Sequence, residues 1–321
     1  MTSKNILIVG VGNIGKRHLE ALLNSKHSLN IHLVDPVLST NNKLLINQSN
    51  FDYKKKKIFF YKTLNTVPAK IFLTILSTTA NYRIKIIKHL IKNNNVKYWI
   101  IEKPLCQSLK DLRYIEETFC KRNSWVNLSY DSNNFLLSLK KTIKKNKLGN
   151  LLVTGKNWGL ACNSIHYLQL FTNYFQSPKL THTKIQLKHW YKTRRKGIYD
   201  VHGKIELHFN NNYSCTFIDN YEENSKEKIK KNCMIFYSKN KKLIINEGEK
   251  TTSFGKTKKQ KISLPRVSRD IIIVLDSLIK KSTCALPLVS SCTTNQRLLL
   301  NIFIDSWNHI KKNKNKNVPI S

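Results

Sequence analysis

A run of three glycines near the start of the chain is the first group of residues with a clear chemical use. Gly10-Val11-Gly12-Asn13-Ile14-Gly15 follows the apolar run Ile6 to Val9 and leads at once into a helical pattern. In such a turn the first glycine permits the tight bend, the second permits a close approach to a phosphate, and the third permits close helix packing. The N–H groups at the start of the helix also favour an anion. The pattern predicts a dinucleotide-binding turn, with contacts from Gly10, Gly12, Asn13, Ile14 and Gly15.

A carboxylate follows the next apolar run at the position where it can bind a ribose. The run Ile31 to Val34 ends in Asp35, and an acidic residue there binds the ribose hydroxyls of a dinucleotide. The alternative, a helix entry that merely happens to be rich in glycine, does not explain Asp35. Because a carboxylate repels a 2′-phosphate, and no basic residue adjoins Asp35, NAD is predicted in preference to NADP. Lys43 is the nearby cation that would allow NADP instead.

Two later apolar runs deliver further polar residues at the ends of predicted strands. Ser77-Thr78 follows one run, and Glu102-Lys103-Pro104 follows another. Ligands of open parallel sheets bind outside the carboxyl ends of the strands, so these residues are predicted to line one crevice with the glycine turn. A lysine beside a bound nicotinamide could polarise a substrate oxygen and move its proton. The alternative for Lys103 is a solvated surface lysine.

Together these motifs resemble the Gfo/Idh/MocA family of nicotinamide-dependent oxidoreductases. The matching pieces span nearly the whole chain: the glycine turn, Asp35, Ser77-Thr78, Glu102-Lys103-Pro104, Val126-Asn127, the helix around His166, and Leu286-Pro287. The resemblance implies an N-terminal Rossmann domain, a doubly wound parallel α/β sheet, and a C-terminal α+β domain with a large open-faced mixed or antiparallel sheet. It also implies cofactor contacts from Ser77, Thr78 and Glu102. The substrates would be sugars, sugar nucleotides, inositols or related carbonyl and carbinol compounds.

His166 matches the histidine that serves as the usual proton acceptor in this family. The family pattern places one aspartate four residues before it and another three residues after it, where this chain has Cys162 and Gln169. A carboxylate partner fixes the tautomer of a histidine and stabilises its charged form. His166 is therefore predicted to be a weaker base, or to be oriented by Asn163 or another group. A histidine satisfied in the core is the alternative, and a lone thiol such as Cys162 is more often inert than nucleophilic.

The predicted substrate-binding residues are Lys103, Asn163, His166, Arg194 and Arg195. An arginine pair suits a carboxylate or a phosphate, so the substrate could be anionic, with a solvated loop pair as the alternative. Thr79 stands where the family usually has proline, and Arg83 stands where it often has histidine. These two changes alter the expected contacts to the nicotinamide ribose.

The composition bounds the class of protein and its partners. The chain has 321 residues, of which 40% are hydrophobic, and this suits two folded domains. The net charge is +37, but the lysines are dispersed along the chain, so we interpret this charge as compositional and expect no nucleic-acid partner.

The sequence also predicts the compartment. No apolar run is long enough to span a membrane, and we expect no secretory signal before the first strand. Seven scattered cysteines predict reduced thiols in a cytoplasmic protein, without a metal site.

Hydrophobic periodicity places the domains. Apolar runs alternating with helical stretches predict an NAD(P)-binding domain over residues 1–128. Residues 129–312 are predicted to form the domain that binds substrate and mediates oligomerisation, with a closing helix at about 293–311, and residues 313–321 a disordered tail. Alternating polar and apolar residues in Lys204–Phe209 predict a sheet with one solvated face, which favours a homo-oligomer.

The predicted function is that of an NAD(P)-dependent oxidoreductase acting on CH–OH groups. It would transfer a hydride between nicotinamide and the carbinol or carbonyl of a sugar-like substrate, with Lys103 and His166 handling the substrate proton. The alternative is a catalytically impaired protein of the same fold that keeps NAD as a sensing or structural ligand. Fold alone cannot choose between these two functions.

Overall fold

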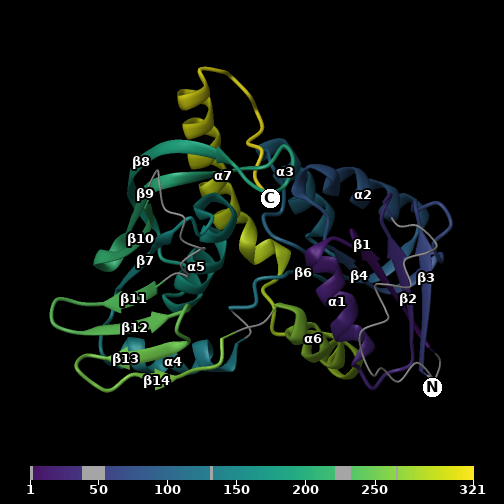
Figure 1. Ribbon diagram of the computed structural model, residues 1–321, viewed down its shortest axis with the longest axis horizontal. Coiled ribbons are helices and arrows are strands. Elements are labelled where there is room, and N and C mark those ends of the chain that lie inside the picture. Colours follow the sequence, from purple (N-terminus) through teal and green to yellow (C-terminus); the bar gives the residue numbers. More distant parts are fainter. Residues whose placement is uncertain (1–2, 38–54, 131–132, 221–232, 265–266) are drawn as a thin grey trace. The chain divides into compact units, whose positions relative to one another are not determined.

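The computed structural model describes residues 3–37, 55–130, 133–220, 233–264 and 267–321 (Figure 1). The chain divides into two compact units. The first unit comprises Met1–Cys106, Lys110–Ser129 and Arg266–Thr293, and the second comprises Gln107–Leu109, Tyr130–Pro265 and Thr294–Ser321. Each unit is built around one sheet.

The sheet of the first unit has six strands, and all of its strand pairs are parallel. The strands are β1 (Lys4–Val9), β2 (Leu29–Val34), β3 (Lys56–Tyr61), β4 (Lys70–Leu76), β5 (Asn95–Ile101) and β6 (Ser124–Val126). Their order is β3-β2-β1-β4-β5-β6, so the order reverses between β1 and β4. Such a reversal is the point where doubly wound sheets bind ligands. The predicted fold class is confirmed for this unit.

Helices cover both faces of this sheet. They are α1 (Asn13–Leu23), α2 (Ala80–Asn93), α3 (Leu109–Phe119) and α6 (Val267–Lys281). α1 and α6 lie side by side and share one apolar cluster with Tyr98 of β5. Trp99, the next residue, packs against Phe119 of α3. Because successive strand residues point to opposite faces, α3 covers the other face. Covering both faces explains why β1, β2, β4 and β5 each end in four buried residues.

The position of α6 corrects the predicted domain boundary. The sequence predicts one boundary after residue 128, whereas residues 267–293 return to the first unit. Apolar side chains of α6, including Leu275, are buried in the first unit's core. His27 also pairs with Asp276 of α6, with Nε2 and Oδ1 2.6 Å apart. A contact between residues so far apart in the chain leaves no local signal in the sequence.

The sheet of the second unit has eight strands in the order β14-β13-β12-β11-β7-β10-β9-β8. Of the described pairs, β7 with β10 is parallel and the others are antiparallel, which confirms a large mixed sheet. The strands are β7 (Asn150–Lys156), β8 (Leu180–Lys192), β9 (Tyr199–Phe209), β10 (Tyr213–Asn220), β11 (Cys233–Tyr237), β12 (Lys242–Asn246), β13 (Thr251–Phe254) and β14 (Gln260–Lys261). A short 3-10 turn, η3 (Asn210–Asn212), joins β9 to β10.

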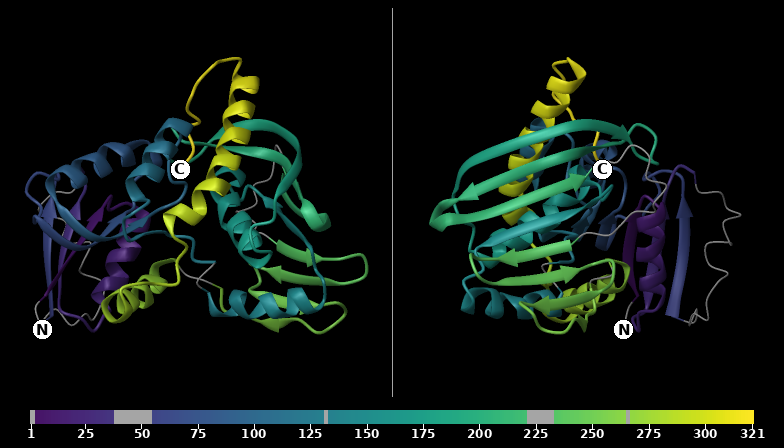
Figure 2. Two further views of the ribbon diagram at one scale, coloured as in Figure 1. Left: turned by 180° about the vertical axis from the view of Figure 1, so that it is seen from behind. Right: turned by 60° about the vertical axis from the view of Figure 1, so that its left-hand side comes forward.

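One face of this sheet packs against helices. The helices are α4 (Asn134–Lys145), α5 (Leu160–Tyr174) and the later part of α7 (Val289–Lys311). Trp190 of β8 packs edge-on against Phe303 and Trp307 of α7, and Phe171 of α5 packs against Phe209. Among the described residues of the second unit, no helix lies over the other face (Figure 2, right). This agrees with the alternating burial of β7, β9, β10 and β11. Among the described residues, no helix has the length and apolar character needed to span a membrane.

The last residues are packed, which corrects the predicted disordered tail. Val318 and Ile320 are fully buried. The backbone N–H of Val318 donates to the carbonyl of Gln107, and the N–H of Tyr199 donates to the carbonyl of Pro319. The polar composition of residues 312–317 predicts fraying, but the two apolar side chains that follow find a buried position through long-range contacts.

Truncating Ile320 tests the packing of this segment. Ile320→Ala should lower the free energy of unfolding by about 2–4 kcal/mol, because it removes buried methyl groups and leaves a cavity. Urea denaturation followed by circular dichroism measures the change. Ile185→Ala, at a side chain that is 42% exposed on β8 of the same unit, is the control and should cost about 1 kcal/mol or less. Equal losses for the two variants would contradict a packed C-terminal segment.

Candidate functional site

The glycine turn is held against the end of β4 by contacts that only glycine permits. Gly10 has φ +89°, and a Cβ there would lie 2.7 Å from the backbone nitrogen of Thr78. A Cβ on Gly15 would lie 2.0 Å from the carbonyl oxygen of Gly10. The hydroxyl of Ser77 donates to that same carbonyl at 2.6 Å. The structure therefore brings together Gly10, Gly15, Ser77 and Thr78, as the sequence predicts for one edge of the sheet.

The N-terminus of α1 fits a phosphate-bearing ligand. Gly12 is the residue before the helix, and no side chain caps the helix there. A Cβ on Gly12 would meet nothing within 4 Å, so the space beside it is open. The first turn of α1, which includes Asn13 and Ile14, contains no acidic residue. An uncapped helix start with open space beside it suits the negative charge of a pyrophosphate.

Asp35 is fixed at the neighbouring strand end. Its Oδ2 accepts the N–H of Val11 in the glycine turn at 2.8 Å, and its Oδ1 accepts the N–H of Val37 at 3.0 Å. The carboxylate is thereby oriented next to the turn, in the place where a dinucleotide presents its ribose. Lys43, the cation that would favour NADP, lies outside the described residues.

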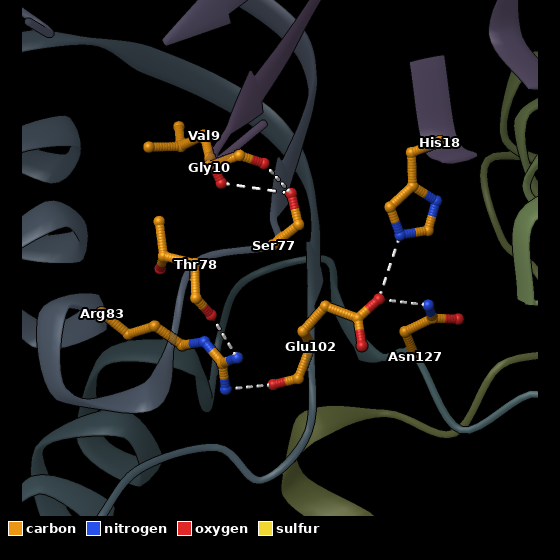
Figure 3. A network of polar contacts seen from close by, with 8 residues as sticks. All are labelled: Val9, Gly10, His18, Ser77, Thr78, Arg83, Glu102 and Asn127. Carbon is orange, nitrogen blue, oxygen red and sulfur yellow. Dashed lines mark hydrogen bonds and ion pairs between the residues drawn. The ribbon is translucent and has the colours of Figure 1, made fainter. Parts of the chain in front are cut away.

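Glu102 sits in a buried polar network (Figure 3). Its Oε1 lies 3.0 Å from Nε2 of His18 in α1 and accepts a 2.5 Å hydrogen bond from the amide of Asn127. His18, Asn127 and Glu102 are all buried. Sequence reasoning missed His18, because nothing in the pattern of α1 shows that this residue faces the end of β5.

The network decides the charge of Glu102. Burial alone would raise the pKa of this carboxyl group, but contributions from three other residues together outweigh it and hold the pKa below its ordinary value. They are the hydrogen bond and charge of His18, the hydrogen bond from Asn127, and the charge of Arg83. Glu102 is therefore a buried carboxylate rather than a neutral acid. The carboxylate is bound by the side chains of His18 and Asn127, and its predicted contact with the cofactor stays a prediction.

Lys103 occupies the turn directly after Glu102 and is half-buried. Its peptide bond to Pro104 is cis. The buried guanidinium of Arg83 donates to the carbonyl oxygens of Glu102 and Pro104, one on each side of Lys103. The same guanidinium donates to the carbonyl of Thr78 at 2.6 Å. The lysine thus projects from a backbone that is held at both neighbours.

His166 lies on α5 in the second unit, beside an aromatic cluster. Its ring centroid is 5.2 Å from that of Tyr130. The hydroxyls of Tyr130 and Tyr167 both donate to Oε1 of Glu247, each at 2.9 Å. Burial, followed by the charge of Glu247, raises the pKa of Tyr130, so this phenol remains a neutral donor. Sequence reasoning missed Tyr130 and Glu247, which come from loops far apart in the chain.

The start of α5 has a carboxylate that does not belong to the helix. Oδ1 of Asp200 in β9 accepts the N–H of Ala161 at 2.7 Å and the N–H of Val201 at 2.9 Å. Burial, more than the charge of Asp219, raises the pKa of Asp200, while these hydrogen bonds oppose the rise. Asp200 thus supplies an acidic group at the helix N-terminus, where negative charge is favoured.

The other residues predicted around His166 have defined partners. The amide of Asn163 donates to the carbonyl of Trp158 at 2.7 Å. Oε1 of Gln169 accepts from the amide of Asn295 at 2.8 Å. Arg194 and Arg195 are exposed in the turn between β8 and β9. Their role in binding substrate stays a prediction, as does that of Asn163.

Lys103 belongs to the first unit and His166 to the second. In the part of the chain that the structure describes, no group of three or more histidine, cysteine or acidic side chains is arranged to hold a metal ion. The first unit therefore presents a dinucleotide-type edge with a lysine, and the second presents a histidine among tyrosines.

These features define the class as that of Rossmann-fold dinucleotide-binding proteins. Residues 4–130 match the Gfo/Idh/MocA family model, described as an oxidoreductase family with an NAD-binding Rossmann fold. This match over residues 4–130 confirms the predicted resemblance to that family. The comparison with curated proteins gives no match.

Solved structures extend the likeness in fold over both units. A super-repressor mutant of Gal80p from Saccharomyces cerevisiae has a TM-score of 0.71 and 14% identity, and the match covers 97% of each chain. UDP-N-acetylglucosamine 3-dehydrogenase GnnA from Acidithiobacillus ferrooxidans has a TM-score of 0.69 and 9% identity, over 94% of this chain and 97% of that one. An Agrobacterium radiobacter oxidoreductase, solved with NAD+, L-tartaric acid and magnesium, has a TM-score of 0.66 and 11% identity, over 94% and 95%. At these identities the likeness is one of fold.

The Glu102 network predicts a pH-dependent contribution to stability. The pKa of Glu102 in the folded state lies below its ordinary value of 4.5. Its contribution to the free energy of unfolding is therefore complete above pH 4.5 and is lost as the pH falls through the lowered pKa. Glu102→Gln should lower the free energy of unfolding by about 2–3 kcal/mol at pH 7, and this difference from wild type should shrink in acid. Urea denaturation at a series of pH values measures this. Glu117→Gln, at an exposed site on α3, is the control and should show neither effect; a pH-independent difference for Glu102→Gln would contradict the network.

Proposed function

We propose that the protein is an NAD-dependent oxidoreductase that interconverts a carbinol and a carbonyl on a sugar, a sugar nucleotide or a related polyol. The observation that carries this proposal is the carboxyl edge of the first sheet. There an uncapped helix start, the oriented carboxylate of Asp35 and the held turn of Lys103 follow strands of one sheet. The match of residues 4–130 to the model of an oxidoreductase family supports it.

The residues of the first unit divide the work of binding. Backbone N–H groups at the start of α1 bind the phosphates, and the Asp35 carboxylate accepts hydrogen bonds from a ribose diol. NAD, when bound, supplies the acceptor or donor of a hydride. Lys103 binds the reacting oxygen of the substrate through Nζ and carries its proton. The held backbone on either side of Lys103 fixes the point from which this side chain extends.

His166 is proposed as the second group that moves the substrate proton. Carboxylates are absent at the two helix positions where the family has them, since Cys162 and Gln169 stand there. Glu247 lies in the same cluster, bonded to the tyrosine that packs on His166. Arg194 and Arg195 are proposed to bind an acidic group of the substrate.

A second copy of this chain is the partner proposed for the open face of the eight-stranded sheet. Leu152, Ile235 and Ile244 are neighbours on that face through direct cross-strand pairing, and all three are partly exposed. Joining two such faces would remove apolar surface from water.

Cofactor binding gives the first test of this function. NADH should bind at least about tenfold more tightly than NADPH, because the Asp35 carboxylate repels a 2′-phosphate. Fluorescence titration of each cofactor measures the two dissociation constants. Asp35→Asn should narrow the preference by weakening NADH and relieving the repulsion of NADPH. Absence of saturable binding of either cofactor would exclude both the enzyme and an NAD-binding sensor.

Turnover by active-site variants gives the second test. A screen of sugars and nucleotide sugars with NAD and NADH identifies a substrate for the wild type. Lys103→Ala and His166→Ala should then each lower kcat by about 10²–10⁴-fold while NADH still binds, since each removes a proton-handling group. Lys85→Ala, at an exposed site on α2, is the control and should keep wild-type turnover. Equal turnover in wild type and Lys103→Ala would contradict the role of Lys103.

One observation favours a second function, that of an NAD-binding sensor without catalysis. Gln169 and Cys162 are both buried and bonded within the protein, to Asn295 and Ser321 respectively. Neither can supply the charge of the family's carboxylates. The similar fold of Gal80p, described as a repressor, shows that such a fold is not confined to enzymes. NADH binding without turnover of any substrate in the screen would favour the sensor.

A further inference from the structure

We propose that Arg83 is a positioning residue that fixes Lys103 relative to the strand end at Ser77-Thr78. This inference deepens the proposed function, since it rests on the role given to Lys103. Arg83 itself would touch neither substrate nor cofactor. It would act through the backbone that carries Lys103.

The contacts of Arg83 join two separate strand ends. Its side chain comes from α2 and is only 1% exposed. The guanidinium donates to the carbonyl of Thr78, after β4, and to the carbonyl of Glu102, after β5 (Figure 3). It also donates to the carbonyl of Pro104. Two of these three acceptors are the residues on either side of Lys103. The backbone around Lys103 is therefore tied to the loop that also closes over Gly10.

The sheet cannot make this connection by itself. At the ends of β4 and β5, the N–H of Glu102 donates a backbone hydrogen bond to the carbonyl of Leu76. After these residues both segments leave the sheet, so their buried carbonyl groups need hydrogen-bond donors from elsewhere. A planar guanidinium carries five N–H donors in a fixed fork and can reach several acceptors at once. A lysine in its place is a single point donor on a flexible stem.

The buried charge of Arg83 is balanced inside the same structure. Its positive charge is one of the contributions that hold the pKa of Glu102 below its ordinary value. The carboxylate of Glu102 is in turn bound by His18 and Asn127. Arg83 thus contacts the backbone of Glu102 and interacts electrostatically with its side chain. The Glu102 carboxylate thereby stabilises the buried positive charge of the Arg83 guanidinium.

The test separates placement of Lys103 from folding and from cofactor binding. Arg83→Gln removes the fork, and Arg83→Lys keeps the charge but not the three bonds. We expect kcat to fall by about 100-fold in Arg83→Gln and about tenfold in Arg83→Lys, because small misplacements of a catalytic group are costly. The dissociation constant of NADH should change by less than about threefold, since the phosphate and ribose contacts remain. Lys85→Gln, an exposed change on the same helix, should match wild type.

A second readout does not depend on turnover. Acetylation of Lys103 by acetic anhydride, followed by peptide mass spectrometry, reports how accessible its amine is. In wild type, saturating NADH should slow this acetylation by about fivefold or more, and in Arg83→Gln by less than about twofold, because the lysine is no longer held beside the cofactor. Thermal unfolding establishes that each variant is folded before it is compared.

The outcomes are distinct. Wild type that binds no NADH overturns the proposed function itself, whereas wild type that binds NADH without turnover leaves the acetylation readout to decide the role of Arg83. Full NADH protection of Lys103 in folded Arg83→Gln overturns the positioning role. So does a loss of NADH affinity as large as the loss of kcat, which would make Arg83 a cofactor-binding residue. If even Arg83→Lys fails to fold, Arg83 is a folding residue and the proposal is overturned.

Discussion

Buried charge must be compensated, and this constraint shapes the carboxyl edge of the first sheet. Glu102 and Arg83 are both buried. Burying an isolated ion in the protein interior would cost several kcal/mol. Each is satisfied by groups from other elements: a histidine from α1, an amide after β6, and carbonyls after β4 and β5. Satisfying the charges therefore joins the helices α1 and α2 to the ends of β4, β5 and β6. The placement of Lys103 follows from that joining.

In the second unit, the carboxylates near His166 come from outside its own helix. Its helix α5 carries His166 but none of the acidic residues that accompany such a histidine in the family. Carboxylates reach the neighbourhood from elsewhere: Asp200 from β9 caps the helix, and Glu247 after β12 holds the two tyrosines. The polar environment is thus supplied by the sheet rather than by the helix. A carboxylate that is absent from the helical motif can thus be supplied to the surroundings of the histidine by another element.

Local pattern predicted the elements well where periodicity was strong. The strands ending in Val9, Val34, Leu76 and Ile101 are confirmed, because buried parallel strands read as continuous apolar runs. The helices α4 and α6 were not predicted, and the C-terminal segment was wrongly expected to be disordered. These elements owe their places to distant contacts, such as those of α6 with α1 and of Val318 with Gln107. The local sequence around each of these elements does not indicate such long-range contacts.

The sequence by itself determined the dinucleotide turn, the carboxylate of Asp35 and the position of Lys103 at a strand end. These features depend on residue types at short spacing, where glycine alone fits and where a strand must stop. Only the tertiary structure decided which groups surround them. Partners outside their own helix, strand or turn give roles to a further set of residues, which are His18, Arg83, Tyr130, Asp200 and Glu247. The physical reason is that burial and charge compensation are properties of the folded interior, which no short stretch of sequence contains.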